Sequence, residues 1–343
     1  MSLLRRIRDW RPARPDQLGL LVMAVADRCD QRCLHCSIWQ GPGAARSLTL
    51  EERLRLADEA LAAGARAALL TGGEPLLSPD LWPVAERLRV GGARLMLATN
   101  GMQLERWAPR VAALFDEVYL SLDGAGAVTH DAARGAAAFD RVRAGVQALR
   151  RLGPRTRVVT RTTLHALNVG ELEAIVAAAR DLGAHHASFL PLDASSAAFG
   201  GTPAERAALV PNAAQVAELL AAVDRLAAAG ALSAEPAGGA PFVLESAQRL
   251  RGLAAHLRAS GGEGPFERPR CDAPWWSVVV EADGALKPCF FHGSVGDARE
   301  GLQSVRQSAG YVRALRDIRA SNQVCERCVC PKWRGPHPVG ANL

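Results

Sequence analysis

Three cysteines near the start of the chain are spaced so that they can bind one metal cluster together. They are Cys29, Cys33 and Cys36, in the order C-x3-C-x2-C, and they follow an apolar run at 20–26. Three thiolates on one short loop can bind three irons of a cubane iron–sulfur cluster and leave the fourth iron open for a small molecule. A zinc site is the competing hypothesis, but no fourth ligand follows at the spacing typical of zinc motifs.

A second group, Gly72-Gly73-Glu74-Pro75, follows the next apolar run. Two successive glycines leave backbone groups exposed and allow a ligand to approach closely. A carboxylate or an exposed backbone group at this position can hold an ammonium group by a charge-assisted hydrogen bond. A glycine-rich turn with Glu74 in solvent is the alternative interpretation.

The segments that must position these residues alternate between short β-like runs and helical stretches. We expect strands at 20–26, 67–71, 94–99, 117–122, 157–164 and 186–190, and helices at 50–63, 79–90, 103–115, 139–152 and 170–182. Six strands that alternate with helices predict an α/β fold whose parallel sheet curls into a barrel. In such barrels the chemistry lies at the carboxyl ends of the strands. Each polar motif falls at such an end: Cys29–Cys36, Gly72–Pro75, Thr99-Asn100, and Ser121 with Asp123.

The cysteine loop and the Gly72–Pro75 turn together resemble the signature motifs of the radical S-adenosylmethionine (radical SAM) superfamily. The resemblance implies a partial (β/α)6 TIM-like barrel that binds SAM on a [4Fe-4S] cluster. One electron from that cluster would cleave SAM, and the resulting 5′-deoxyadenosyl radical would remove a hydrogen atom from the substrate. The protein's part in such chemistry is binding, orientation and exclusion of water.

The same resemblance implies roles for residues around the SAM groove. His35 would lie against the adenine, Leu190 would pack on it, and Gly72–Pro75 would hold the methionine ammonium. An arginine is expected to complete a clamp on the SAM carboxylate, and we select Arg141, with Arg134 as the runner-up and solvated arginines as the alternative. The remaining groove residues are Thr99, Asn100, Ser121, which would help to hold the carboxylate, and Asp123, which would lie near the ribose or the substrate.

The other five cysteines all lie toward the carboxyl end of the chain: Cys271, Cys289, Cys325, Cys328 and Cys330. Asp283-Gly284 predicts a hairpin between the first two. This order resembles the SPASM/twitch extension of radical SAM enzymes and implies one auxiliary [4Fe-4S] cluster on Cys271, Cys289, Cys325 and Cys328. A full SPASM domain needs more cysteines than five, so Cys330 is either free or replaces Cys328. Zinc is the competing metal for four thiolates.

We expect four regions: a basic leader at 1–19, the barrel at 20–210, a helical linker at 211–267 and the SPASM/twitch domain at 268–343. In the leader, Arg5, Arg6, Arg8, Arg11 and Arg14 contribute to a net charge of +6. A solvated leader is the favoured interpretation over a nucleic-acid or membrane contact, because aromatic residues make up only 5% of the chain. No apolar run is long enough to span a membrane. Eight cysteines in this context favour metal sites in a reducing cytoplasm over disulfides.

The predicted function is hydrogen abstraction from a peptide or small metabolite, with flavodoxin or ferredoxin as electron donor. A fully ligated auxiliary cluster favours net oxidation, either a dehydrogenation or a cross-link. If Cys330 instead returns a hydrogen atom, the outcome is epimerisation. The short stretch before Cys29 leaves no room for an N-terminal peptide-recognition domain. A non-catalytic zinc- or iron-binding protein is the alternative from a different class.

Overall fold

The computed structural model describes residues 17–40, 47–153, 155–232, 241–320 and 322–330. The arginines of the predicted leader lie outside these residues. No helix in the described ranges is long and apolar enough to cross a membrane.

The core of the molecule is one nine-stranded sheet with the order β6-β5-β4-β3-β2-β1-β7-β8-β9. Strands β1 to β7 are parallel, and β8 and β9 run antiparallel as a small extension. The partial-barrel prediction is therefore confirmed, because β1 to β6 form the expected parallel set. The strands are β1 (Leu20–Ala26), β2 (Ala67–Gly72), β3 (Arg94–Thr99), β4 (Glu117–Ser121), β5 (Arg157–Leu164), β6 (His186–Pro191), β7 (Ser277–Val280), β8 (Ala285–Lys287) and β9 (Gly296–Asp297).

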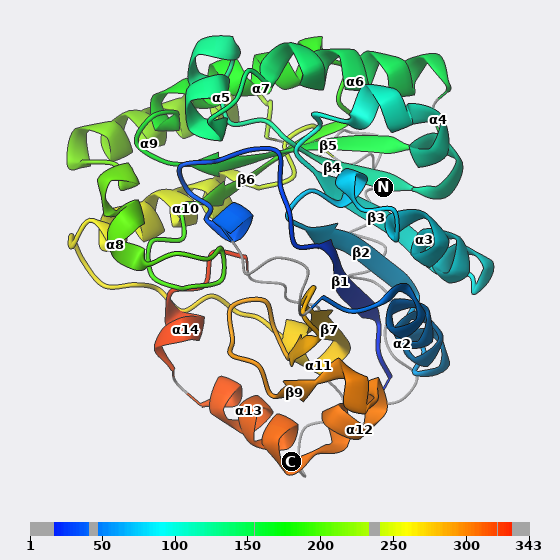
Figure 1. Ribbon diagram of the computed structural model, residues 1–343. Helices are drawn as coiled ribbons and strands as arrows, with labels where there is room; N and C mark the ends of the chain where they lie inside the picture. The colour runs from blue at the N-terminus through cyan, green and yellow to red at the C-terminus, as the bar shows by residue number, and fades with distance from the viewer. Residues whose placement is uncertain (1–16, 41–46, 154, 233–240, 321, 331–343) are drawn as a thin grey trace.

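Helices α2 to α7 lie along the outside of the curved sheet, and the carboxyl-terminal elements gather beyond β7 (Figure 1). The α-helices are α2 (Leu50–Ala62), α3 (Leu81–Val90), α4 (Leu104–Leu114), α5 (Ala127–Arg134), α6 (Phe139–Arg151), α7 (Leu172–Asp181), α8 (Pro203–Arg206), α9 (Ala213–Ala228), α10 (Ala247–Ser260), α11 (Ala273–Trp276), α12 (Leu302–Gln307), α13 (Ala309–Arg319) and α14 (Gln323–Glu326). The short 3-10 helices are η1 (Ile38–Gln40), η3 (Pro75–Leu77), η4 (Val169–Glu171), η5 (Ala207–Leu209) and η6 (Ala298–Glu300). The sequence patterns did not predict α5, which turns out to lie against the cysteine loop.

The alternation of side chains along the strands divides the buried residues into two sets. Outward-facing residues such as Leu21, Leu95 and Val118 pack with the helices in the main hydrophobic core. Inward-facing residues form a smaller cluster that fills the barrel interior: Leu20, Ala67, Met96, Tyr119 and Val159, together with Ala273 and Trp276. Because successive strand residues point to opposite faces, the inner row next above Tyr119 begins with Ser121.

Later segments cover both open edges of the six-stranded barrel. At one edge, β7 pairs in parallel with β1, with Leu20 opposite Ser277. At the other, residues 242–244 pair with β6: the Ala187 amide donates to the Phe242 carbonyl, and the Leu244 amide donates to the Ala187 carbonyl. The sheet thus crosses the predicted boundary at 268 without a break, and the edges are protected from pairing with other chains.

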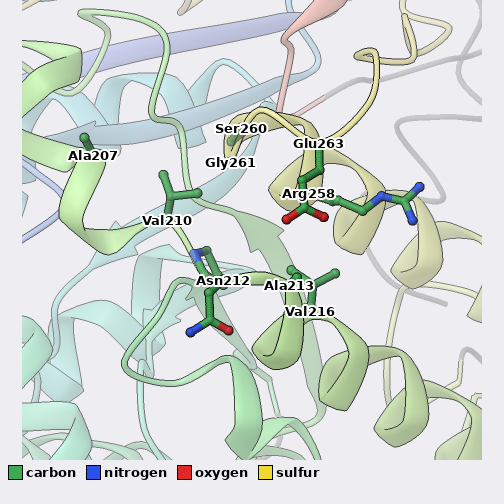
Figure 2. Close-up of a pocket in the computed structure, with 10 residues that line it drawn as sticks. Ala207, Val210, Asn212, Ala213, Val216, Arg258, Ser260, Gly261 and Glu263 are labelled. Atoms are coloured by element: carbon green, nitrogen blue, oxygen red, sulfur yellow. The ribbon is translucent and has the colours of Figure 1, made fainter.

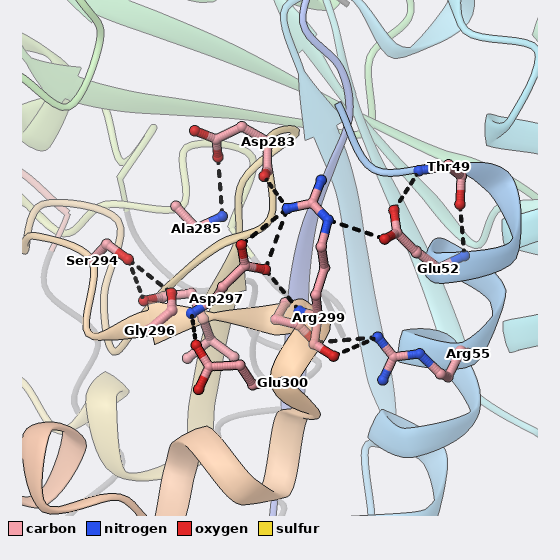
Figure 3. Close-up of polar contacts among 12 residues, drawn as sticks. Thr49, Glu52, Arg55, Asp283, Ala285, Ser294, Gly296, Asp297, Arg299 and Glu300 are labelled. Carbon is pink, nitrogen blue, oxygen red and sulfur yellow. Dashed lines mark hydrogen bonds and ion pairs between the residues drawn. The ribbon is translucent and has the colours of Figure 1, made fainter. Parts of the chain in front are cut away.

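A polar network fixes the carboxyl-terminal elements against α2 (Figure 3). Arg299 donates from Nε to Glu52 at 3.0 Å and from Nη1 to the Asp283 carbonyl at 2.8 Å. The Leu302 amide donates to Glu59 of α2 at 2.6 Å. The contacts with Glu52 and Glu59 join segments more than two hundred positions apart in the chain, so they hold the carboxyl-terminal elements against the barrel.

Candidate active site

The Gly72–Pro75 turn is joined directly to the chain that leads into the cysteine loop. The Gly73 amide donates to the Ala26 carbonyl at 2.9 Å, and the Glu74 amide donates to the Arg28 carbonyl at 2.7 Å. A Cβ atom on Gly73 would lie 2.2 Å from the Arg28 oxygen, and Gly72 has φ +132°. The close approach that these glycines permit is therefore with the protein's own backbone.

Glu74 is a structural anchor and not a residue exposed to a ligand. Its carboxylate accepts hydrogen bonds from the Leu76 amide at 3.0 Å, Thr99 Oγ1 at 2.8 Å and the Asn100 amide at 2.7 Å. The side chain is fully buried, and burial raises its pKa to about 7 although these hydrogen bonds oppose the shift. The carboxylate is therefore not available to the SAM ammonium, which was one of the two predicted contacts. The other predicted contact, exposed backbone at the turn, stays a prediction.

Glu74→Gln is expected to destabilise the protein by about 1–3 kcal/mol, because it places a donor opposite donors in a buried site. Glutamine has only one acceptor oxygen, so its NH2 group would face either the Asn100 amide or the Leu76 and Thr99 donors. Urea denaturation measures this loss. Glu86→Gln, which alters an exposed carboxylate paired with Arg110, is the matched control and should change stability by less than about 1 kcal/mol. Equal effects of the two substitutions would contradict the anchoring role.

Asn100, at the end of β3, contacts the cysteine loop. Its Nδ2 donates to Asp30 at 2.7 Å and lies 3.6 Å from the Cys29 sulfur. Thr99, beside it, is buried and donates to Glu74. Asn100 therefore supports the cysteine loop directly, whereas Thr99 supports the Glu74 carboxylate.

Asp123 is fully buried and paired with Arg134, whose Nη2 lies 2.7 Å from Asp123 Oδ2. Burial raises the pKa of Asp123, but Arg134 and His35 outweigh it, so the net shift is downward and the carboxylate is charged. Its Oδ1 accepts from the Thr163 amide at 2.8 Å. Both carboxylate oxygens thus face protein groups, and the expected place of Asp123 beside the ribose or substrate stays a prediction.

The two arginines proposed for the carboxylate clamp lie in different surroundings. Arg141 is exposed on α6. Arg134 is buried, and its Nη1 lies 3.7 Å from the Cys33 sulfur. Helix periodicity places α6 on the outside of the barrel, and this separates Arg141 from the strand ends.

An arginine that the sequence analysis missed lies on the inner face of the barrel. Arg161 on β5 is directly opposite Ser121 on β4 and opposite Ser188 on β6. Its guanidinium lies 4.9 Å from the Tyr119 ring centroid, and it forms no ion pair within 4 Å with any described residue. The available sequence signal was the alternation of the expected strand at 157–164, which puts Arg161 on the same face as Val159 and Thr163.

A carboxylate lies in the same inner row. Glu245 accepts from Ser188 Oγ at 2.7 Å and from the Phe189 amide at 3.0 Å. Burial raises its pKa, and Arg161 is among the groups that oppose the shift. The barrel interior thus brings together the Arg161 guanidinium, the Glu245 carboxylate and the hydroxyl groups of Ser121 and Ser188.

His35 and Leu190 lie at the upper rim. His35 is buried, its ring centroid is 5.7 Å from that of His165, and burial lowers its pKa to about 4. Leu190 is half-buried on β6 opposite Thr163, in the inner row above Arg161. Their proposed contacts with adenine stay predictions.

The residues of the first loop fit an iron–sulfur cluster. Cys33 is buried, Cys29 and Cys36 are half-buried, and burial raises the pKa of all three thiols, that of Cys29 to about 11. Metal binding requires thiolates, so the ligand must supply compensating positive charge. The Nε2 atom of buried Gln31 and Nδ1 of His35 lack hydrogen-bond partners among the described residues, which fits polar groups facing a bound cofactor.

The five carboxyl-terminal cysteines also gather at one place. Burial raises the pKa of Cys289 to about 12, and Cys271, Cys330 and Cys325 add to the shift. Cys271, Cys289 and Cys330 likewise raise the pKa of Cys328, which burial raises most. His292, which the sequence analysis missed, has Nε2 at 3.5 Å from the Cys325 sulfur.

These thiols do not converge on a single point within the part of the chain that the structure describes. No three His, Cys, Asp or Glu side chains within the described ranges close on one metal ion. A tetrahedral zinc with Zn–S bonds of about 2.3 Å needs its four sulfurs in close contact, whereas the ligands of a cubane each bind a different iron. Four or five clustered thiols suit an iron–sulfur cluster, and zinc stays the competing metal for the same ligands.

Aromatic side chains connect the two cysteine regions. The Phe199 carbonyl accepts from the Ser37 amide, next to Cys36, at 2.7 Å. The Phe199 ring centroid lies 5.2 Å from that of Phe290 and 6.2 Å from that of Phe291, which follow Cys289. The segment around Phe199 is thereby held between the two cysteine sets.

A cavity of about 380 Å³ lies away from these residues, between the start of α9 and the end of α10. Figure 2 shows Asn212 and Val216 on one side of it and Arg258 with Glu263 on the other. The Asn212 side chain already caps α9 by accepting from the Gln215 amide at 3.0 Å. None of the predicted site residues lines this cavity.

Two family models match the regions that the geometry singles out. The radical SAM superfamily model matches residues 23–179, and an iron–sulfur cluster-binding domain model, SPASM, matches residues 271–329. The chain carries a radical SAM domain followed by an iron–sulfur cluster-binding SPASM domain. The cysteine loop and the Gly72–Pro75 turn fall in the first match, and Cys271, Cys289, Cys325 and Cys328 fall in the second. SAM and iron–sulfur clusters are accordingly the cofactors of this radical SAM protein.

Similar proteins of known name cover only part of the chain. GTP 3',8-cyclase 1 of Pseudomonas aeruginosa is 34% identical over 54% of this chain and 58% of its own length. The AdoMet-dependent heme synthase of Methanosarcina barkeri is 34% identical over half of each chain. This radical SAM chain thus spans about half the length of the curated relatives that it matches.

Solved structures share the fold over nearly the whole chain. Streptococcus suis SuiB superposes with a TM-score of 0.64 at 16% identity, covering 92% of this chain and 72% of SuiB. The anSMEcpe enzyme with bound AdoMet and a peptide gives a TM-score of 0.61 at 15% identity, covering 91% and 86%. At these identities the likeness establishes the fold alone.

Proposed function

We propose that this radical SAM protein cleaves SAM at the Cys29–Cys36 loop and removes a hydrogen atom from a substrate in the barrel. One observation supports this most strongly: both sets of cysteines border the same interior. The first set lies at the strand ends, while Cys271 packs beside the inner cluster that contains Trp276 and Tyr119. Cys330 contributes to the raised pKa of Tyr119, so it also lies near the interior.

The chain's own residues bind and orient the cofactor in this proposal. When bound, the [4Fe-4S] cluster and SAM supply the one-electron cleavage that yields the 5′-deoxyadenosyl radical. Ser121 and Arg161, which share an inner row, hold the SAM carboxylate in place of the arginine selected from the sequence. Backbone groups around Gly72 and Gly73 hold the ammonium, and His35 and Leu190 contact the adenine.

Net oxidation is the reaction that we favour. One auxiliary [4Fe-4S] cluster on Cys271, Cys289, Cys325 and Cys328 would accept the second electron, giving a dehydrogenation or a cross-link. The nearness of Cys330 to Tyr119 supports a second candidate, epimerisation, in which the Cys330 thiol returns a hydrogen atom. The two differ in the product: oxidation lowers the substrate mass by two hydrogens, whereas epimerisation leaves the mass unchanged.

The substrate in this proposal is a peptide or a small metabolite. A peptide is bound in the structure of anSMEcpe, and a precursor peptide is bound in a SuiB structure of the same fold. The names of the sequence relatives instead refer to GTP and heme. We further propose flavodoxin or ferredoxin as electron donor and the cytoplasm as compartment, since all eight cysteines are free thiols.

The test is to measure iron, acid-labile sulfide and zinc per chain after anaerobic reconstitution, together with 5′-deoxyadenosine formation from SAM. We expect about eight irons per chain, as two four-iron clusters require, and reductant-dependent cleavage of SAM. About four irons with one zinc would assign the SPASM region to a structural role and refute the oxidation proposal. Zinc alone, without cleavage, would indicate a non-catalytic metal-binding protein.

A further inference from the structure

We propose that Arg134 raises the reduction potential of the SAM-cleaving cluster by placing a positive charge beside the Cys33 thiolate. Arg134 is a positioning residue in this role, because it acts through Cys33 and does not touch the substrate. The inference rests on the proposed binding of that cluster by Cys29, Cys33 and Cys36.

The contact is built from two buried partners. Arg134 Nη1 lies 3.7 Å from the Cys33 sulfur, and Nη2 lies 2.7 Å from Asp123 Oδ2. Arg134 is 8% exposed and Asp123 is fully buried, so solvent screens neither charge effectively. An arginine guanidinium stays protonated in proteins, so the group beside the Cys33 sulfur is charged.

Backbone contacts on both sides of Arg134 fix α5 against the cysteine loop. The Leu34 amide donates to the Ala133 carbonyl at 3.0 Å. Gly135 ends α5 with φ +64°, and a Cβ atom on it would lie 2.5 Å from the Arg32 carbonyl oxygen. The backbone contacts of Ala133 and Gly135 therefore fix the position of α5 from which the Arg134 side chain reaches the Cys33 sulfur.

The arginine makes its close contact with one sulfur of the loop, that of Cys33. Cys29 has a neutral donor, Asn100 Nδ2 at 3.6 Å, whereas Cys33 has a cation. Reduction adds an electron to the cluster and its thiolates, so a nearby positive charge stabilises the reduced state. Asp123 opposes this effect from the far side of the guanidinium, which predicts shifts of opposite sign when the two partners are neutralised separately.

The experiment is a redox titration of the reconstituted holoenzyme without SAM, followed by electron paramagnetic resonance of both clusters. Arg134→Met should make the potential of the first cluster more negative, and Asp123→Asn should make it more positive. Arg134→Lys keeps the charge and should lie between Arg134→Met and the wild type. The auxiliary cluster is an internal reference and should not shift in any variant.

Arg141→Met is the matched control, because it removes the same charge from the exposed face of α6. It should leave both potentials unchanged. Unchanged or equally shifted potentials in all variants would overturn the inference, as would a shift of the same sign in Arg134→Met and Asp123→Asn. If Arg134→Met does not assemble the cluster, Asp123→Asn decides, because asparagine retains an acceptor for the Thr163 amide. A wild-type protein that assembles no first cluster would instead refute the proposed function.

Discussion

Replacing Cys33 with alanine is expected to abolish SAM cleavage. The Cys33 thiol is buried at the centre of the loop and is the ligand that Arg134 contacts, and alanine carries no group that could replace the thiolate. Loss of a ligand should exceed the roughly 10–100-fold effect of losing an outer partner of a metal site. Anaerobic reconstitution followed by chromatography of 5′-deoxyadenosine measures the effect, and iron should fall by about half from the proposed two clusters.

Cys330→Ala is the matched control for this substitution. It makes the same chemical change outside the first loop, so SAM cleavage should persist at close to the wild-type rate. Cleavage retained by Cys33→Ala would refute the assignment of the first cluster to this loop. Cleavage lost equally in both variants would point to a general folding defect, which circular dichroism of the two proteins would reveal.

Cys271→Ala is also expected to lose about half of the iron, but SAM cleavage should continue. Cys271 borders the inner cluster with Trp276 and lies beside β7, which is held to β1 by a parallel ladder. That ladder does not depend on the thiol, so the barrel should stay closed after the substitution. Iron analysis, and electron paramagnetic resonance of the remaining cluster, would show which site is empty.

The same measurement on Cys325→Ala and Cys330→Ala identifies the fourth ligand among the five clustered thiols. In the proposed set, Cys325→Ala loses the auxiliary cluster and Cys330→Ala retains it. The reverse result would assign Cys330 as the ligand and leave Cys325 with His292, which lies 3.5 Å from its sulfur. Full iron in Cys271→Ala would refute the auxiliary site altogether.

The strands and the position of the motifs could be predicted from the sequence because both depend on local patterns. Apolar runs with β-branched residues marked β1 to β6, and polar residues at their ends had to meet at one rim, since parallel strands bring their carboxyl ends together. The first helix could likewise be located from Thr49 and Glu52, which form the capping box that begins α2. The two cysteine sets were recognisable from spacing alone.

The partners of buried charges could not be predicted in this way. Glu74 and Asp123 lie in motifs that suggest ligand contact, yet each carboxylate is occupied by donors from strands distant in the chain. Spacing along a sequence says which residues share a strand end. Spacing does not say whether a side chain points toward the cofactor or toward other protein groups, because the packing of separate elements decides its direction.

The tertiary structure alone decided three further features: the docking of α5, the inward position of Arg161 and the addition of β7 to the edge of the barrel. Arg134 meets Cys33 only because Gly135 allows α5 to approach the loop, and Arg161 faces the interior only because its strand is in register with Ser121. β7 adds to β1 across a separation of more than two hundred positions. The sequence thus determined the chemistry that this chain carries, through residue types and local periodicity. Long-range register and packing determined which side chains surround that chemistry, because those contacts form only when the whole sheet is assembled.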